Sequence, residues 1–195
     1  MNTCILMGSP RKKGNTASLL EPFTDELLLF GNLVQTFWLH DLAIGPCIAC
    51  RACQQDEAGF GCPICDDVPM LFNHILQSDL IVFATPIYSW YCTPPTKALL
   101  DRLVYGMNKY YGEKKGPALW AGKQVAAVVT CGYRPETGAD LFDTGLQRYC
   151  KHSQLIYAGM HTERHLGYGT VFMDEEKETR VRAFARKLAS PNIHR

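Results

Sequence analysis

Two short runs of this chain are apolar at nearly every position, and they constrain its fold more than any other feature. They occupy residues 80–85 and 124–130. A strand with one solvated face alternates apolar and polar residues, whereas a strand buried on both faces is apolar throughout. Neither run is long enough to cross a bilayer. We therefore expect both to be central strands of a parallel sheet that is covered by helices on each face.

The rest of the chain alternates between strand-like and helix-like segments. Further strands are expected at 3–7, 33–39 and 154–160, and apolar spacings of three and four predict helices that begin at Thr16, Val68, Thr96, Asp140 and Asp174. Pro22 should kink or delay the first helix. This order predicts an α/β sandwich. The length of 195 residues, without repeats or a linker, predicts a single domain over 1–195, with the glycine-rich segment 106–122 as an inserted loop.

Charge and cysteine usage exclude several classes of protein. The chain has 20 Lys plus Arg against 19 Asp plus Glu, and its only basic stretch is Arg11-Lys12-Lys13, which argues against a nucleic-acid binder. No basic segment precedes the first apolar run, so we expect no secretory signal, and because the apolar runs are too short to span a bilayer we expect no association with a membrane. Nine cysteines, an odd number, do not suggest a disulfide framework. We expect a cytoplasmic protein.

The loop after the first expected strand has the residues of a phosphate site. In an open parallel sheet, ligands bind outside the carboxyl ends of the strands. Residues 8–16 offer hydroxyls at Ser9 and Thr16, a cation at Arg11 and backbone N–H groups at a helix start. The loop lacks the lysine-serine ending of an ATP-type P-loop and the glycine spacing of a dinucleotide fingerprint, so a monophosphate fits best. The alternative is a solvated basic turn.

The loop after the run at 80–85 is stiff and aromatic. Residues 85–95 contain Tyr88, Trp90 and Tyr91 together with three prolines. Such a shelf can hold a flat heterocycle, and the alternatives are an ordinary hydrophobic turn or a dimer contact. The loop after 124–130 is unspecific on its own.

Taken together, these motifs resemble a known family. Gly8-Ser9-Pro10-Arg11 with Gly14-Asn15-Thr16, then Pro86-Ile87-Tyr88, then Lys97 with Asp101-Arg102 are similar to the NADPH-dependent FMN reductase group of flavodoxin-like proteins, over residues 1 to about 157. The cysteines extend the resemblance to the iron–sulfur flavoprotein branch. The resemblance implies a flavodoxin-like three-layer sandwich, a five-stranded parallel sheet of order 2-1-3-4-5, FMN at the carboxyl ends of the strands, and a homodimer or homotetramer.

The resemblance also implies which residues bind FMN. The family commonly has a small residue where this chain has Trp90. The implied phosphate ligands are Ser9, Arg11, Asn15 and Thr16; the residues lining the isoalloxazine ring are Pro86, Ile87, Tyr88, Ser89 and Trp90, with Thr130, Cys131 and Gly132 opposite.

Five of the nine cysteines lie within residues 47–65, which indicates metal or redox chemistry. Cys47, Cys50 and Cys53 have the compact spacing of a four-iron cluster site, which needs a fourth thiolate from further along the chain. Related flavoproteins have a cysteine four residues before the position of Asp66, and this implies Cys62 as the fourth ligand. Two alternatives remain: zinc bound by two CxxC pairs, the second ending at Cys65, or free, redox-active thiols.

We therefore expect an oxidoreductase that takes electrons from NAD(P)H to FMN and on to an acceptor such as a quinone, a flavin or another small molecule. The rival function is an electron carrier, with FMN and a 4Fe-4S cluster, that exchanges electrons with ferredoxin-like proteins. A zinc-stabilised interaction module without flavin is a third possibility. No catalytic acid or base is assigned, because the cofactor does the chemistry.

Overall fold

The computed structural model describes residues 1–113 and 115–189. Its centre is a five-stranded, fully parallel sheet of order β2-β1-β3-β4-β5, which confirms the flavodoxin-like topology. The strands are β1 (Asn2–Met7), β2 (Leu33–Trp38), β3 (Leu80–Pro86), β4 (Gln124–Cys131) and β5 (Ile156–Arg164). The helices are α1 (Asn15–Leu29), η1 (Leu39–Asp41), η2 (Ala52–Gln54), α2 (Val68–Gln77), α3 (Pro94–Met107), α4 (Pro135–Gly138), α5 (Asp140–His152) and α6 (Glu175–Ala189).

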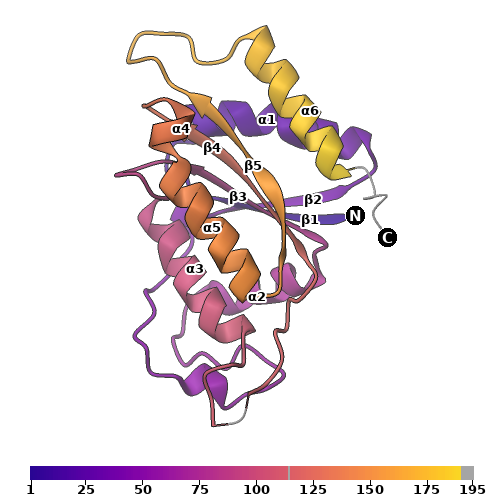
Figure 1. The fold of residues 1–195 in the computed structure, drawn as a ribbon, viewed down its shortest axis with the longest axis vertical. Coiled ribbons are helices and arrows are strands. Elements are labelled where there is room, and N and C mark those ends of the chain that lie inside the picture. The colour runs from indigo at the N-terminus through magenta and orange to yellow at the C-terminus, as the bar shows by residue number, and fades with distance from the viewer. Residues whose placement is uncertain (114, 190–195) are drawn as a thin grey trace.

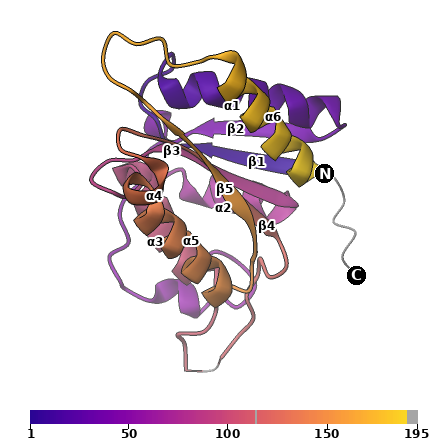
Figure 2. The same cartoon turned by 45° about the horizontal axis from the view of Figure 1, so that its top comes forward.

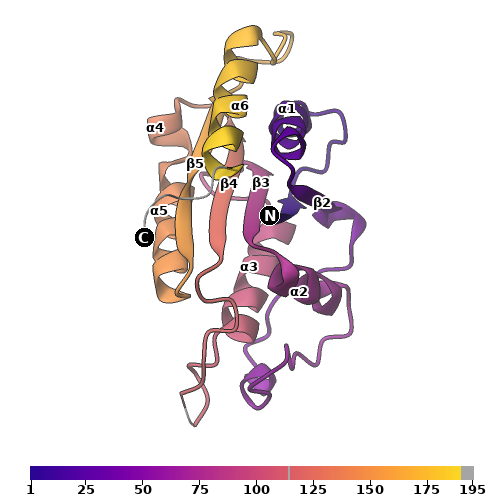
Figure 3. The ribbon, with the colours of Figure 1, turned by 90° about the vertical axis from the view of Figure 1, so that its right-hand side faces the viewer.

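The helices cover both faces of the sheet, as Figures 1 and 3 show. Alternate residues of β3 point to opposite faces: Ile81 and Phe83 pack with α2, α3 and α5, whereas Leu80, Val82 and Ala84 pack with α1 and α6. β3 and β4 are almost completely buried, as their continuous apolar sequences predict. No helix in the described part of the chain is long and apolar enough to span a membrane.

Several elements differ from the sequence prediction. α1 begins at Asn15 and continues through Pro22, so the proline does not delay the helix. β5 extends to Arg164, past the expected end at Met160, because its backbone stays paired with β4 up to Cys131, which lies opposite Arg164. α3 extends to Met107, so the expected inserted loop begins inside a helix.

Candidate cofactor pocket and cysteine pocket

A cavity of about 200 Å³ opens at the carboxyl edge of the sheet. The sheet register places the ends of β3 and β4 side by side, with Pro86 opposite Thr130. The loop after β1 closes the cavity on another side. The lining residues are Ser9, Arg11, Gly14, Asn15, Thr16, Pro86, Ile87, Tyr88, Thr130, Cys131, Gly132, His165 and Tyr168. The three loops singled out in the sequence therefore meet around one cavity.

The loop after β1 presents an anion-binding surface to this cavity. Gly14 precedes α1, and no side chain caps the first turn, so its N–H groups are available to a ligand. Thr16, at which the first helix was expected to begin, lies inside α1, and its Oγ1 is 2.7 Å from Thr130 Oγ1. Ser9 Oγ accepts a hydrogen bond from the Arg11 N–H at 3.2 Å. The Arg11 side chain is exposed beside these groups.

Gly8 allows the loop after β1 to lie against the start of α3. Thr93 Oγ1 donates to the Gly8 carbonyl at 2.8 Å. A Cβ atom at Gly8 would lie 2.1 Å from Thr96 Oγ1, far inside van der Waals contact. The end of β1 and the beginning of α3 are therefore fixed to each other through a position that only glycine fits.

Ser89 and Trp90, both expected to line the flavin ring, lie outside the lining of the cavity. They form the tip of a tight turn in which the N–H of Tyr88 donates to Tyr91 O and the N–H of Tyr91 donates to Tyr88 O. Both tip residues have positive φ, 49° and 62°, as in a type I′ turn. The Trp90 ring stacks on Tyr133 with ring centroids 5.7 Å apart.

Two cavity residues, His165 and Tyr168, were not predicted from the sequence. They belong to the segment between β5 and α6, which arches past the tips of the strands (Figure 2). The N–H of His165 donates to Cys131 O at 2.8 Å. Tyr168 is 95% exposed and lies between Gly167 and Gly169, both with positive φ. An aromatic residue between two glycines just after a strand is the signal that could have identified it.

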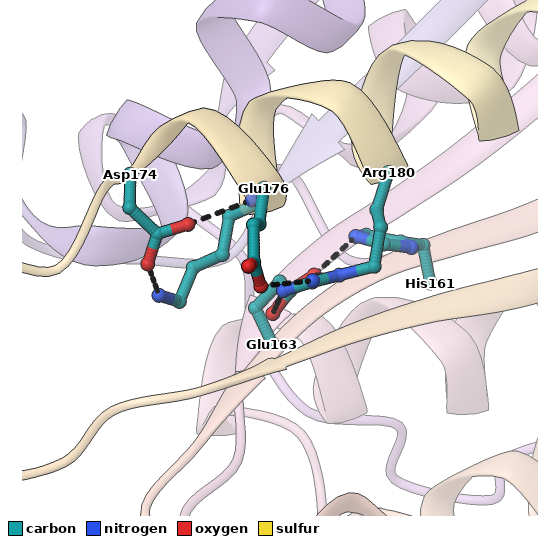
Figure 4. Close-up of polar contacts among 6 residues, drawn as sticks. His161, Glu163, Asp174, Glu176 and Arg180 are labelled. Carbon is teal, nitrogen blue, oxygen red and sulfur yellow. Dashed lines mark hydrogen bonds and ion pairs between the residues drawn. The ribbon is translucent and has the colours of Figure 1, made fainter.

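Side chains fix both ends of this segment (Figure 4). Glu163, at the end of β5, accepts hydrogen bonds from Arg180 of α6 at 2.8 and 2.9 Å, and His161 Nε2 lies 3.1 Å from its carboxylate. Burial opposes ionisation of Glu163, but these partners outweigh it and hold its pKa at about 2. At the other end, Asp174 accepts the Lys177 N–H at 2.8 Å and caps α6.

The thiols near the cavity are not activated. Burial raises the pKa of the Cys131 thiol, and it raises the pKa of Cys92 to about 12. Both side chains are therefore neutral thiols near pH 7, which does not favour a nucleophilic role.

A second cavity, of about 120 Å³, contains the cysteines of the loop between β2 and α2. Cys47, Cys50, Cys53 and Cys62 all line it, and Cys65 is not among the described residues that do. The four-cysteine set expected for an iron–sulfur cluster is thus gathered around one space. The two CxxC pairs expected for zinc are not gathered there, because Cys65 lies outside the cavity.

The loop that carries these cysteines, residues 42–67, is held by α3 and the residues after it. Figure 1 shows this loop and the segment after α3 side by side, beyond the end of that helix. Gln54 Nε2 donates to Tyr105 O at 2.6 Å and to Asn108 O at 3.1 Å. A Cβ atom at Gly106 would lie 2.2 Å from the Phe60 ring, so glycine makes room for Phe60 of the loop. The segment 106–122 therefore supports the cysteine loop.

Arg102 is the buried cation of the cysteine cavity. Its guanidinium pairs with Asp66 and donates from Nη2 to Cys62 Sγ at 3.3 Å. Its Nε is buried and has no hydrogen-bond partner among the described residues. Burial raises the pKa of the Cys53 thiol, partly offset by a hydrogen bond from Gln54.

In the described ranges, no three His, Cys, Asp or Glu side chains lie close enough to hold a single metal ion. In a four-iron cluster each thiolate binds a different iron, so the thiolates lie further apart than the ligands of one ion. Four thiols beside an unpartnered buried N–H suit such an anionic, sulfur-containing group.

The sequence profile of a family described as NADPH-dependent FMN reductase matches residues 1–142. An iron–sulfur flavoprotein of Archaeoglobus fulgidus is 28% identical over 158 residues, which cover 81% of this chain and 68% of the relative. An iron–sulfur flavoprotein of Methanocaldococcus jannaschii is 31% identical over 97 residues, which cover 50% of this chain and 49% of the relative. The match thus spans only about half the length of the second relative.

The fold is similar to that of solved structures along nearly its whole length. The NAD(P)H:quinone oxidoreductase from Methanothermobacter marburgensis superposes with a TM-score of 0.73 at 20% identity, covering 98% of each chain. This likeness concerns the fold.

Proposed function

The chain belongs to the NADPH-dependent FMN reductase family, and on this premise we propose that it passes electrons from NAD(P)H through noncovalently bound FMN to an acceptor such as a quinone, a free flavin or another small molecule. The observation that carries the proposal is the cavity at the carboxyl edge of the sheet. Its lining includes every residue expected to bind FMN except Ser89 and Trp90. The proposal covers residues 1–195 as a single FMN-binding domain of a cytoplasmic homodimer or homotetramer.

In this proposal the loop after β1 binds the FMN phosphate. Arg11 supplies a positive charge, Ser9 and Thr16 supply hydroxyls, and Asn15 begins the helix whose first N–H groups are uncapped. A phosphate at a helix start gains about 0.3–1 kcal/mol from the helix dipole. A hydrogen bond from a charged group such as Arg11 adds roughly 1.5–3 kcal/mol.

The ends of β3 and β4 would hold the flavin ring between them. Pro86, Ile87 and Tyr88 at the end of β3 line the cavity together with Thr130, Cys131 and Gly132 at the end of β4. Bound FMN would supply the hydride and electron chemistry, and the protein would orient the ring and exclude water. His165 and Tyr168 extend the wall at the mouth of the cavity.

A second function is favoured by the cysteine cavity. In this alternative, Cys47, Cys50, Cys53 and Cys62 bind a 4Fe-4S cluster, and the protein exchanges electrons with ferredoxin-like partners. Two observations support it: the four cysteines line one cavity, and the relatives in two archaea are named iron–sulfur flavoproteins. Exposed Cys50 gives this cavity access to solvent.

One experiment tests both functions. Protein purified without oxygen is examined by UV–visible spectroscopy before and after addition of NADPH, and then of NADH. A flavin spectrum that bleaches supports the reductase, and a broad brown shoulder beneath it reveals the cluster. A flavin spectrum that neither nucleotide changes favours the electron carrier. A colourless protein that does not take up added FMN contradicts both.

A further inference from the structure

Two buried cations reach the cysteine loop from the same side. Arg102 is 2% exposed and Lys109 is 1% exposed. Arg102 contacts the loop at Asp66, Gly45 O and Cys62 Sγ. Lys109 Nζ donates to Cys53 O at 2.8 Å and to Gly59 O at 2.7 Å. A buried charge costs several kcal/mol unless an opposite charge accompanies it, so each cation requires an explanation.

Among the described residues, these two buried cations have one carboxylate within ion-pair distance between them, that of Asp66. Asp66, with a side chain only 6% exposed, offsets the charge of Arg102. Lys109 has no carboxylate within ion-pair distance in the described part of the chain, and both of its acceptors are neutral carbonyls. The nearby carboxylate of Asp56 is exposed to solvent, which screens its charge. Arg102 Nε also lacks an acceptor. An anion in the cysteine cavity would supply the missing negative charge, and its sulfur atoms could accept from Arg102.

We propose that Arg102 and Lys109 are the counter-cations of an anionic iron–sulfur cluster bound by Cys47, Cys50, Cys53 and Cys62, and that they raise its reduction potential. This proposal rests on the cluster assignment made above. Such a cluster gains one negative charge when it accepts one electron, so nearby positive charges stabilise the reduced form. Arg102 is in addition a positioning residue, because its hydrogen bond orients the Cys62 sulfur toward the cavity.

A purely structural role for Lys109 predicts a different outcome. In that case the ammonium only holds two carbonyls of the loop, and its removal loosens the loop without changing the potential of a cluster that remains bound. The reduction potential separates the two roles, because it responds to charge and not merely to the stability of the loop.

The test is a redox titration of the iron-loaded protein of residues 1–195 with dithionite, followed by electron paramagnetic resonance. Lys109→Met removes the charge and keeps a long apolar side chain. We expect it to retain iron but to disfavour the reduced cluster about tenfold, which corresponds to about 59 mV for a one-electron couple. Lys109→Arg keeps the charge and should restore the potential. Lys115→Met is the matched control, because it removes an exposed cation from the same segment.

Each outcome decides the proposal. An unchanged potential in an iron-loaded Lys109→Met protein overturns it. If Lys109→Met loses its iron, the titration is made on Lys109→Gln, which keeps N–H donors for the two carbonyls but no charge. A lowered potential there supports the proposal, and an unchanged potential or loss of iron in all three variants overturns it. Wild-type protein that binds FMN but cannot be loaded with iron overturns this inference and the cluster assignment, while the flavin proposal stands.

Discussion

The two pockets of this molecule are held in place in different ways. The walls of the pocket at the carboxyl edge are mostly the ends of β1, β3 and β4, whose positions follow from the hydrogen bonds of the parallel sheet. The cysteine pocket lies in a loop whose only regular element is the short η2 (Ala52–Gln54), and side chains attach this loop to α3. The first pocket depends on backbone register and the second on individual contacts.

This difference predicts how each pocket responds to substitution. The pocket at the carboxyl edge of the sheet, here called the edge pocket, should keep its shape when one of its side chains is removed, because the hydrogen-bonded strands fix the positions of its walls. The cysteine pocket should open when a single anchoring contact is lost. One wall of the edge pocket, the segment between β5 and α6, is held like the cysteine loop, by the Glu163 ion pairs.

The largest expected effect is on the cysteine loop. Gly106→Ala places a methyl group where the Phe60 ring now lies, 2.2 Å from its nearest atom. Forcing the ring aside should cost about 3 kcal/mol of local stability. We expect the cysteines of the loop to react much faster with a thiol reagent, while FMN affinity stays within about twofold of wild type because the sheet register is unchanged.

A second substitution controls for this result. Phe60→Leu in the Gly106→Ala background removes the clash, and thiol reactivity should return toward that of Phe60→Leu alone. If Gly106→Ala weakens FMN binding as strongly as it exposes the cysteines, the two pockets are not held independently.

The next largest effect is expected for the wall of the edge pocket formed by the segment between β5 and α6, which the ion pairs of Glu163 hold in place. Glu163 has a pKa of about 2, below its usual value of 4.5. Its ionised carboxylate therefore contributes fully to the free energy of unfolding above pH 4.5, and this contribution is lost as the pH falls toward 2. Glu163→Gln should lower the free energy of unfolding by about 2 kcal/mol at pH 7, after allowance for the half-exposed Arg180 partner. The gap between variant and wild type should narrow by about half at pH 3.

Urea unfolding at both pH values measures this gap. Glu176→Gln is the matched control, because Glu176 is 87% exposed and pairs with the same arginine at 3.4 Å. It should cost less than about 0.5 kcal/mol. A gap between Glu163→Gln and wild type that does not depend on pH would contradict the ion-pair explanation.

A smaller effect is expected for an exposed side chain of the edge pocket. Arg11→Ala should weaken FMN binding about tenfold, or about 1.4 kcal/mol, because the uncapped N–H groups of α1 remain to bind the phosphate. Thermal stability should not change. Titration of flavin fluorescence measures the affinity, and Lys13→Ala, which removes a neighbouring cation outside the cavity, should have little effect. Equal losses in both variants would indicate nonspecific attraction.

The smallest effect is a gain in stability. Ser89 has a φ of 49°, which favours glycine, so Ser89→Gly should stabilise the turn by about 0.5–1 kcal/mol. Because Ser89 lies outside the cavity, FMN affinity should be unchanged. Calorimetry measures the first quantity and fluorescence titration the second. A marked loss of FMN affinity would place Ser89 in the binding site after all.

Much of the edge pocket could be predicted from the sequence because strands buried on both faces have a continuous apolar pattern. The three loops that follow β1, β3 and β4 were therefore found, and topology brings them together. The wall containing His165 and Tyr168 was not found, since the last residues of β5 are polar and only Glu163 among them is buried, where it contacts α6. No local pattern in the sequence indicates this contact between β5 and α6.

The cysteine pocket shows the same limit more clearly. The spacing of Cys47, Cys50 and Cys53 indicated a site, but not what holds it. Arg102 meets Asp66 across 36 residues and Lys109 meets Cys53 across 56 residues. Gly106 was expected to begin a loop, but it lies in helix α3, where the absence of a side chain makes room for the Phe60 ring. Contacts between residues so far apart in the sequence depend on how the chain packs, and the periodicity of apolar residues does not predict them.

Helix α3 starts beside one pocket and reaches the other. Thr93, just before the helix, donates to the carbonyl of Gly8 in the loop after β1, and Arg102, nine residues later, donates to Cys62. At 1.5 Å per residue this stretch spans about 14 Å, and an inserted turn would lengthen it by about 5.4 Å. The helix therefore acts as a spacer of fixed length. Because electron tunnelling slows steeply with distance, the number of residues in α3 would determine how fast electrons pass between the FMN and the cluster proposed for these two pockets.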